Sequence, residues 1–232
     1  MIDLHNSCIR VSDTNICKFC FSGAIIKNGT TKTKKQQYFC KTCQKRFLDY
    51  YSYQAYGKGI NAQIIQLTKE GLGIRSIARI LDISANTVLK RILKIAEHIN
   101  LPVLRYHQCY ELDELRFFIR KKNNPVWLVY AIEKSSKRVA PFYIGKRNNR
   151  SLNAVIKTLI NAKAETIYTD KLNNYQYLIP EEIHSVKRYA TNHIERQNLS
   201  IRTHLKRLSR KTICYPKSIK ITTAILKIYF WL

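Results

Sequence analysis

The sequence is short of acidic residues and lacks a long hydrophobic run. Asp and Glu number 15 against 41 Lys and Arg, which gives a formal net charge of +26 at pH 7. A surface this basic repels itself and needs a polyanion. Nucleic acid is the usual partner, because each neutralised phosphate releases a counterion. An anionic membrane surface or a ribosomal location is the alternative reading of the charge.

The missing hydrophobic run argues against a membrane segment. The N-terminal residues 1–10 include few apolar side chains, and the apolar stretch 221–232 carries Lys227 and is too short to span a bilayer. We therefore expect no membrane contact and a soluble, cytoplasmic protein. An apolar content of 45% predicts a folded chain, and 232 residues suffice for one to three domains.

Composition divides the chain into three expected domains. Residues 1–55 hold five of the seven cysteines, residues 56–102 look helical, and residues 103–232 alternate between strand-like and helix-like patterns. In a reducing compartment these cysteines point to metal ligands or buried thiols rather than disulfides. The expected fold is multidomain, with a cysteine-rich module and an all-α module before an α/β domain.

The first domain carries two cysteine pairs at the spacing of a zinc site. Cys17-Lys-Phe-Cys20 is followed after nineteen residues by Cys40-Lys-Thr-Cys43. Four thiolates form the closed tetrahedral shell of a structural Zn²⁺, which would supply folding energy to a segment this small. Strands are expected at 25–27 and 37–39 with a turn at Asn28-Gly29. A redox pair is the alternative, and Cys8 is a spare.

The second domain has the pattern of a helix-turn-helix. Ile60 and Ile64 recur at helical spacing, a second helix begins near Ile74, and Ser84 is a plausible N-cap for a third. Asp82 would take the positive φ of the turn. An ordinary helical bundle is the alternative. The exposed face of the third helix would then bind DNA through Asn86, Thr87, Lys90, Arg91 and Lys94.

The third domain contains nine of the scarce acidic residues. Asp113 lies in an alternating stretch, 109–119, and further strands are expected at 126–132 and 138–144. A helix over 151–162 then leads to a short strand, 165–169, that ends in Asp170. A helix followed by a strand with a carboxylate at its tip suggests α/β architecture with a site at the strand ends. The nine acidic residues are Glu111, Asp113, Glu114, Glu133, Glu165, Asp170, Glu181, Glu182 and Glu195.

Glu195 lies on an expected long helix over 192–210. At 100° per residue, one stripe of this helix is apolar and a separate stripe carries polar residues. A weak pairing of Glu195 with Asn198 or Arg202 on the same helix is the alternative role for this carboxylate. The apolar stripe consists of Ile194, Ile201, Leu205 and Leu208, and the polar stripe of Glu195, Asn198, Arg202, Lys206 and Ser209.

Three converging carboxylates in a basic protein would suit phosphodiester chemistry. Two divalent cations can activate the attacking oxygen and stabilise the leaving one, and Mg²⁺ or Mn²⁺ needs only a few carboxylate ligands. Asp113, Asp170 and Glu195 are the candidates. Nearby cations would hold DNA phosphates: Arg196, Arg202, Lys206, Arg207, Arg210 and Lys211.

Several of these motifs resemble one family. The run 187–213, which contains Ile194-Glu-Arg196, resembles the signature of the bacterial transposases typified by insertion sequence one. So do Glu111-Leu-Asp-Glu114 and Tyr168-Thr-Asp170. The 24 residues between Asp170 and Glu195 match the family's spacing. The likeness covers nearly the whole chain, although Leu115-Arg116 stands where the family often has a tryptophan.

The resemblance implies a ribonuclease H-like catalytic domain with Asp113, Asp170 and Glu195 as metal ligands. It also implies binding to the terminal inverted repeats of an insertion sequence, transposition by strand cleavage and strand transfer, and a homo-oligomer that pairs two DNA ends. The partner is double-stranded DNA, both element ends and target, with no small-molecule substrate, and the protein is expected at the bacterial nucleoid. In many family members the two halves lie in separate reading frames, whereas here they are continuous.

Two rival functions fit part of the sequence. A tyrosine recombinase is suggested by His204-Leu-Lys-Arg207 with Tyr215 or Tyr229 as nucleophile, but the chain is short for that domain. A DNA-binding regulator, or a decayed transposase, would need only the first two domains. Convergence of the three carboxylates is the geometric observation that separates these readings. No role is assigned to Cys109 or Cys214.

Overall fold

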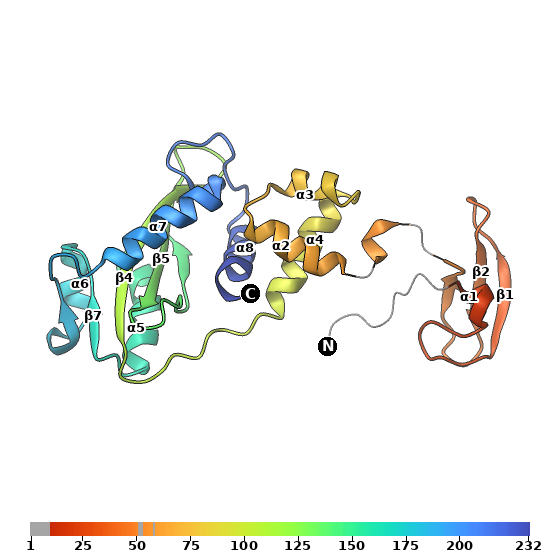
Figure 1. Cartoon of the computed structure of the whole chain (residues 1–232), viewed down its shortest axis with the longest axis horizontal. Helices are drawn as coiled ribbons and strands as arrows, with labels where there is room; N and C mark the ends of the chain where they lie inside the picture. The colour runs from red at the N-terminus through yellow and green to blue at the C-terminus, as the bar shows by residue number, and fades with distance from the viewer. Residues whose placement is uncertain (1–9, 51–52, 58) are drawn as a thin grey trace.

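The computed structural model describes residues 10–50, 53–57 and 59–232. A small cysteine-rich sheet, a group of helices and a larger mixed sheet follow one another along the chain (Figure 1). This is the multidomain order expected from composition. The spare Cys8 lies outside the described residues.

The cysteine-rich module is a three-stranded antiparallel sheet after a short helix. The expected turn at Asn28-Gly29 is wrong, because both residues lie inside β1. The pairing of β1 shifts between Lys27 and Thr30, and Gly29 takes a φ of 73° there. The chain instead reverses at Thr31–Lys35, where Thr31 N–H donates to the Lys35 carbonyl. The elements are α1 (Val11–Thr14), β1 (Ile25–Thr30), β2 (Gln36–Cys40) and β3 (Arg46–Leu48).

The helical region confirms the expected helix-turn-helix pattern. Ser84 accepts a hydrogen bond from the Thr87 N–H at 3.1 Å and so caps the third helix, while Asp82 takes a φ of 49° in the turn. Ile83 and Val88 are buried as anchors. The elements are η1 (Gln54–Tyr56), α2 (Ile60–Lys69), α3 (Ile74–Ile80) and α4 (Ala85–Glu97).

The larger sheet has five strands in the order β6-β5-β4-β7-β8. The first three strands in sequence form an antiparallel meander, and the last two run parallel to β4. The strand expected at 138–144 is shorter than predicted and begins only at Tyr143, although Val139 forms an isolated bridge to Ile132. The strands are β4 (Cys109–Phe118), β5 (Pro125–Glu133), β6 (Tyr143–Gly145), β7 (Thr166–Tyr168) and β8 (His184–Ser185).

Helices cover both faces of this sheet (Figure 1). Leu112 of β4 packs with α5, whereas Leu115 of the same strand packs with α7, so alternate residues of β4 face opposite helices. The helix expected over 192–210 ends early, because Leu205 leaves helical geometry at φ −95° and ψ 73°. The helices are α5 (Asn149–Asn161), α6 (Asn173–Leu178), η2 (Glu181–Ile183), α7 (Asn192–His204), η3 (Lys206–Leu208) and α8 (Ile219–Trp231).

The C-terminal helix α8 joins the helix-turn-helix to the five-stranded sheet. It lies between the sheet and helices α2 and α4 in Figure 1, and buried residues from all of them form one hydrophobic core. Gly71 tightens this junction, because a Cβ at its position would stand 1.8 Å from the His204 carbonyl oxygen. Among the described residues, α8 included, no helix has the length and apolar character needed to cross a membrane.

Candidate active site

The parallel pairing of β4 and β7 brings two of the predicted carboxylates together. Glu111 pairs with Tyr168, so Asp113 and Asp170 each lie two residues further along adjacent parallel strands. One carboxylate oxygen from each lies within 4.8 Å of the other and of a Glu114 oxygen. Asp113 and Asp170 therefore meet where the sequence places them, and Glu114 joins them.

The electrostatics of this cluster suit a cation. Burial raises the pKa of Asp113 to about 6, and the charges of Glu114 and Asp170 act in the same direction against the hydrogen bond from the Glu114 N–H. Burial also raises the pKa of Glu114. Three carboxylates that repel one another in a partly buried place fit a divalent cation with oxygen ligands, such as Mg²⁺ or Mn²⁺.

A buried hydrogen-bond chain orients Asp113. Tyr130 Oη donates to Asn198 Oδ1 at 2.8 Å, and Asn198 Nδ2 donates to Asp113 Oδ2 at 2.7 Å. The tyrosine hydroxyl thus fixes which way the amide points and which Asp113 oxygen is occupied. The helical stripe identified Asn198 only as a possible partner of Glu195 on the same helix, and Tyr130 carried no signal beyond strand alternation.

Glu111 has a positioning role that sequence reasoning missed. Its carboxylate is fully buried and accepts the backbone N–H groups of His193 and Ile194, each at 2.9 Å, and pairs with the His193 ring. These groups form the first turn of α7, so a residue two positions before Asp113 caps the helix that carries Glu195. The alternation of β4, which puts Glu111 and Asp113 on one face, was the available signal.

Glu195 is not a member of this cluster. Its side chain is exposed and accepts a hydrogen bond from Thr191 Oγ1 at 3.0 Å. Within the described part of the chain, the carboxylate group within 4.8 Å contains Glu114 rather than Glu195. Glu195 is three residues before Asn198, which is about 60° around the helix, so it projects from the side of α7 that faces Asp113.

The six predicted phosphate-binding cations differ in their exposure and contacts. The Arg202 guanidinium lies close enough to Asp113 for the two charges to interact, and burial lowers its pKa. Arg207 corrects the prediction, because it is turned inward and donates to the Leu72 carbonyl at 2.9 Å, which ties η3 to the helix-turn-helix. The remaining four cations are exposed: Arg196, Lys206, Arg210 and Lys211.

The α4 residues predicted to contact DNA also differ in their exposure and contacts. Asn86, Lys90 and Lys94 are exposed. Arg91 instead donates to Asn61 Oδ1 at 2.9 Å and to the Ala55 carbonyl at 2.7 Å, which joins α4 to α2 and η1 and corrects its expected role in DNA contact. Thr87 hydrogen-bonds Ser84 and Tyr53 at the start of the helix.

All four predicted cysteine ligands meet at one point. The Sγ atoms of Cys17, Cys20, Cys40 and Cys43 lie within 4.8 Å of one another. Cys17 and Cys43 are 3.6 Å apart, and Cys20 and Cys40 are 3.5 Å apart. Tetrahedral zinc with Zn–S bonds of about 2.3 Å separates its sulfurs by about 3.8 Å, so the thiols fit that ion.

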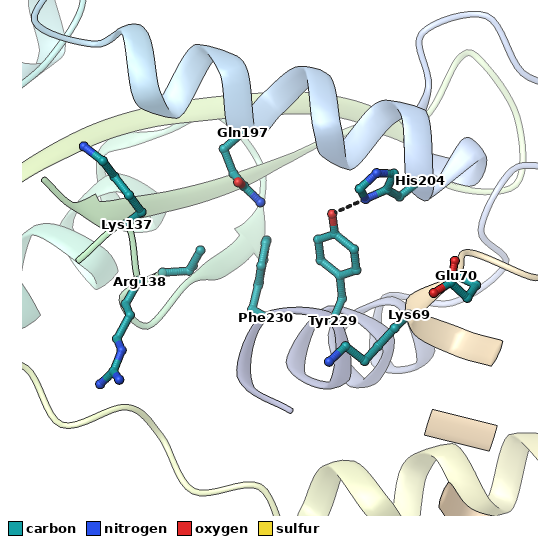
Figure 2. Close-up of a pocket in the computed structure, with 9 residues that line it drawn as sticks. Lys69, Glu70, Lys137, Arg138, Gln197, His204, Tyr229 and Phe230 are labelled. Atoms are coloured by element: carbon teal, nitrogen blue, oxygen red, sulfur yellow. Dashed lines mark hydrogen bonds between the residues drawn. The ribbon is translucent and has the colours of Figure 1, made fainter. Parts of the chain in front are cut away.

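A cleft of about 480 Å³ is lined by residues of α7 and α8 (Figure 2). His204 and Tyr229 line it and are hydrogen-bonded at 2.7 Å. This pair is part of the tyrosine recombinase alternative. Arg207, however, is bonded to the Leu72 carbonyl, so the three residues do not form one site. Figure 2 also shows Lys69, Lys137 and Arg138 around the cleft.

Two structural likenesses are weak. A chain of a simian T-cell lymphotropic virus intasome, solved in complex with PP2A regulatory subunit B56 gamma, has 14% identity and a TM-score of 0.40, over 70% of this chain and 66% of that one. The HTLV-2 integrase catalytic core domain in complex with magnesium has 17% identity and a TM-score of 0.36, over 55% of this chain and 86% of that one.

Family comparisons are decisive. Residues 107–231 match the model described as IS1 transposase, and residues 51–96 match the InsA C-terminal domain. Insertion element iso-IS1n protein InsB of Shigella dysenteriae is 31% identical over 50% of this chain and 88% of its own length. The IS1 4 protein InsB of Escherichia coli K12 is 29% identical over 52% and 72%, respectively. The chain therefore belongs to the IS1 transposase family, with a DNA-binding helix-turn-helix part and a DDE catalytic part.

Proposed function

We propose that this chain cuts the ends of its own insertion sequence and joins them to target DNA, using a metal-dependent carboxylate site. The meeting of Asp113 and Asp170 within 4.8 Å, where β7 ends beside β4, carries this proposal. If the register of the β4–β7 pairing were shifted, these two carboxylates would not lie together.

Asp113, Asp170 and Glu195 are the proposed catalytic triad. Bound there, two divalent cations would activate the attacking water or 3′-hydroxyl and stabilise the leaving oxygen. The protein holds Asp113 through Asn198 and holds the first turn of α7 through Glu111. Glu195 is exposed on the side of α7 that carries Asn198. Among the described residues, no buried contact holds its carboxylate away from a cation bound at Asp113.

The rest of the chain would bind and hold DNA. Asn86, Lys90 and Lys94 on α4 are proposed to read the terminal inverted repeats, with Thr87 at the helix start. The exposed cations Arg196, Lys206, Arg210 and Lys211, together with Arg202, are proposed to hold phosphates near the site. Pairing of two ends would require a homo-oligomer.

The cysteine module is proposed to be a zinc ribbon that supports end binding. Its four thiols fit a tetrahedral ion, and among the described residues its buried core is Val11, Cys17, Tyr38, Cys40 and Phe47, with Ile25 and Cys43 packed against it. A core this small needs a metal to stay folded. Removal of zinc is expected to abolish binding to the element ends, and unchanged binding by the metal-free protein would contradict this role.

Strand cleavage and joining on the element's end sequences with Mg²⁺ tests the proposed function. Wild type should join ends to target DNA, and Glu195→Gln should bind the ends equally well but fail to join them. Equal joining by both proteins would remove Glu195 from the triad. End binding without any cleavage by wild type would instead indicate a DNA-binding regulator.

A further inference from the structure

Glu114 reaches the carboxylate cluster from the opposite face of β4. Asp113 points toward α7, where Asn198 binds it, whereas Glu114 interacts with Arg147, just before α5, and with Tyr175 of α6. The two side chains nevertheless bring carboxylate oxygens within 4.8 Å of each other and of Asp170. This is possible because β7 ends at Tyr168 and leaves the edge of β4 uncovered beside Asp113 and Glu114.

The carboxylate of Glu114 is buried without enough compensation. Its side chain is only 3% exposed, and Oε2 lies 3.5 Å from the guanidinium of Arg147, which is itself 43% exposed. The other oxygen, Oε1, is buried and makes no well-formed hydrogen bond within the described chain; the Tyr175 hydroxyl, which interacts with this carboxyl group, also lacks one. A buried carboxylate oxygen with no partner is costly unless a ligand binds it.

We propose that Glu114 is a direct ligand of a divalent cation bound between Asp113 and Asp170. Its carboxylate is the third one in the group with the two aspartates, and Glu195 is outside that group. Only the reaction that the bound cation would serve depends on the proposed function; the binding of the cation by Glu114 does not. It concerns metal binding by the free protein, before DNA arrives.

One consequence separates this arrangement from a site built on the triad alone. If Glu114 is a ligand, the protein without DNA binds a cation through Asp113, Glu114 and Asp170 even when Glu195 is replaced. Glu195 would then complete the catalytic site rather than create its first cation site. Arg147, which competes with the cation for Glu114, should weaken metal binding.

Titration of the full chain with Mn²⁺, followed by electron paramagnetic resonance without DNA, tests this proposal. Glu114→Gln should weaken Mn²⁺ binding at least about tenfold, since even residues that only orient a ligand change affinity 10- to 100-fold. Arg147→Met should bind Mn²⁺ as tightly as wild type or more tightly. Glu182→Gln, an exposed carboxylate of the same domain, is the matched control and should bind as wild type does.

Two outcomes would overturn the proposal. Equal Mn²⁺ binding by Glu114→Gln and wild type would show that Glu114 serves only Arg147 and Tyr175. Weaker binding by Arg147→Met would show that the ion pair shapes the site instead of competing with the cation. Melting temperatures in chelator check folding. Loss of an uncompensated buried charge should leave Glu114→Gln at least as stable as wild type.

The result can be told apart from failure of the proposed function. Mn²⁺ binding is measured without DNA, and strand joining is measured separately. Tight Mn²⁺ binding by Glu114→Gln with loss of joining by Glu195→Gln would remove Glu114 as a ligand and leave the triad standing. Weak Mn²⁺ binding by Glu114→Gln with full joining by Glu195→Gln would support Glu114 as a ligand and remove Glu195 from the triad.

Discussion

The cysteine cluster and the carboxylate cluster are both groups of metal-ligating side chains, yet they are assembled differently. Each Cys-x-x-Cys pair is local, so two thiols converge wherever the chain forms a tight knuckle. The carboxylates come from β4 and from Asp170, the second residue after β7, and their meeting depends on sheet register across more than fifty residues of chain. We therefore expect the first cluster to depend on a bound metal for folding, whereas the second depends on the surrounding fold.

The largest expected effect is on the cysteine module. Cys40→Ser should unfold the β1–β3 sheet, because structural zinc contributes about 10–16 kcal/mol in isolated zinc-finger peptides. Hydrogen exchange over residues 25–48 should become fast while the five-stranded sheet stays protected. Cys214→Ser, at an exposed cysteine, should change neither protection nor zinc content. Retained protection in Cys40→Ser would show that the two clusters do not differ in this way.

The next largest effect is on catalysis, without unfolding. Asp170→Asn should reduce strand joining about a thousandfold, which corresponds to about 4 kcal/mol of transition-state stabilisation. Asp170 is exposed and its side chain accepts one backbone hydrogen bond, from Leu172, so the melting temperature in chelator should hardly change. A large drop in melting temperature would mean that this cluster, like the thiols, supports the fold.

The same contrast explains what the sequence could predict. The Cys-x-x-Cys spacing identified all four thiols, and they meet as expected. Helical periodicity correctly gave Ile194, Ile201, Leu205 and Leu208 as buried, even though α7 ends at His204, because an ensuing 3-10 turn keeps the last two inside. Propensity alone could not show that Leu205 leaves helical geometry.

Non-local packing was the part that could not be predicted. Arg91 and Arg207 are basic residues of the kind that contact DNA. In the folded chain, however, Arg91 donates to the Ala55 carbonyl and Arg207 to the Leu72 carbonyl, and folding alone brings these acceptors within reach. The packing of α8 on the helix-turn-helix likewise depends on contacts between distant segments. A basic side chain on a helix thus indicates DNA contact only when no internal acceptor lies beside it.

Glu111 tests how strongly the carboxylate site depends on its framework. Glu111→Ala should cost about 3 kcal/mol of unfolding free energy, because two buried N–H groups of α7 lose a charged acceptor. Strand joining should fall as the first turn of α7 loosens. His193→Ala removes a side chain that is 44% exposed and leaves both backbone bonds, so it should have a much smaller effect. Equal losses in the two variants would mean that the ring pairing, not the cap, holds α7.

The smallest expected effect is a loss of stability with rising pH that comes from the carboxylate cluster; the Cys40 thiol, whose pKa is lowered to about 6 by a backbone hydrogen bond from Cys43, acts in the opposite direction. The pKa of Asp113 is raised from 3.8 to about 6 in the folded chain, so folding favours the protonated form. Its contribution to stability is complete below about pH 4 and is lost as the pH rises through 6. The loss is at most about 3 kcal/mol, and partial solvent exposure of the cluster reduces it.

Urea unfolding in chelator between pH 4 and 7 measures this effect. Asp113→Asn should remove most of the decline in stability with rising pH, because an amide has no proton to lose. Saturating Mn²⁺ should also reverse the decline in wild type, since a cation binds the ionised carboxylates and therefore favours the folded state more strongly as the pH rises. A decline that persists unchanged in Asp113→Asn would assign the titration to another group and leave the three carboxylates without the repulsion inferred for them.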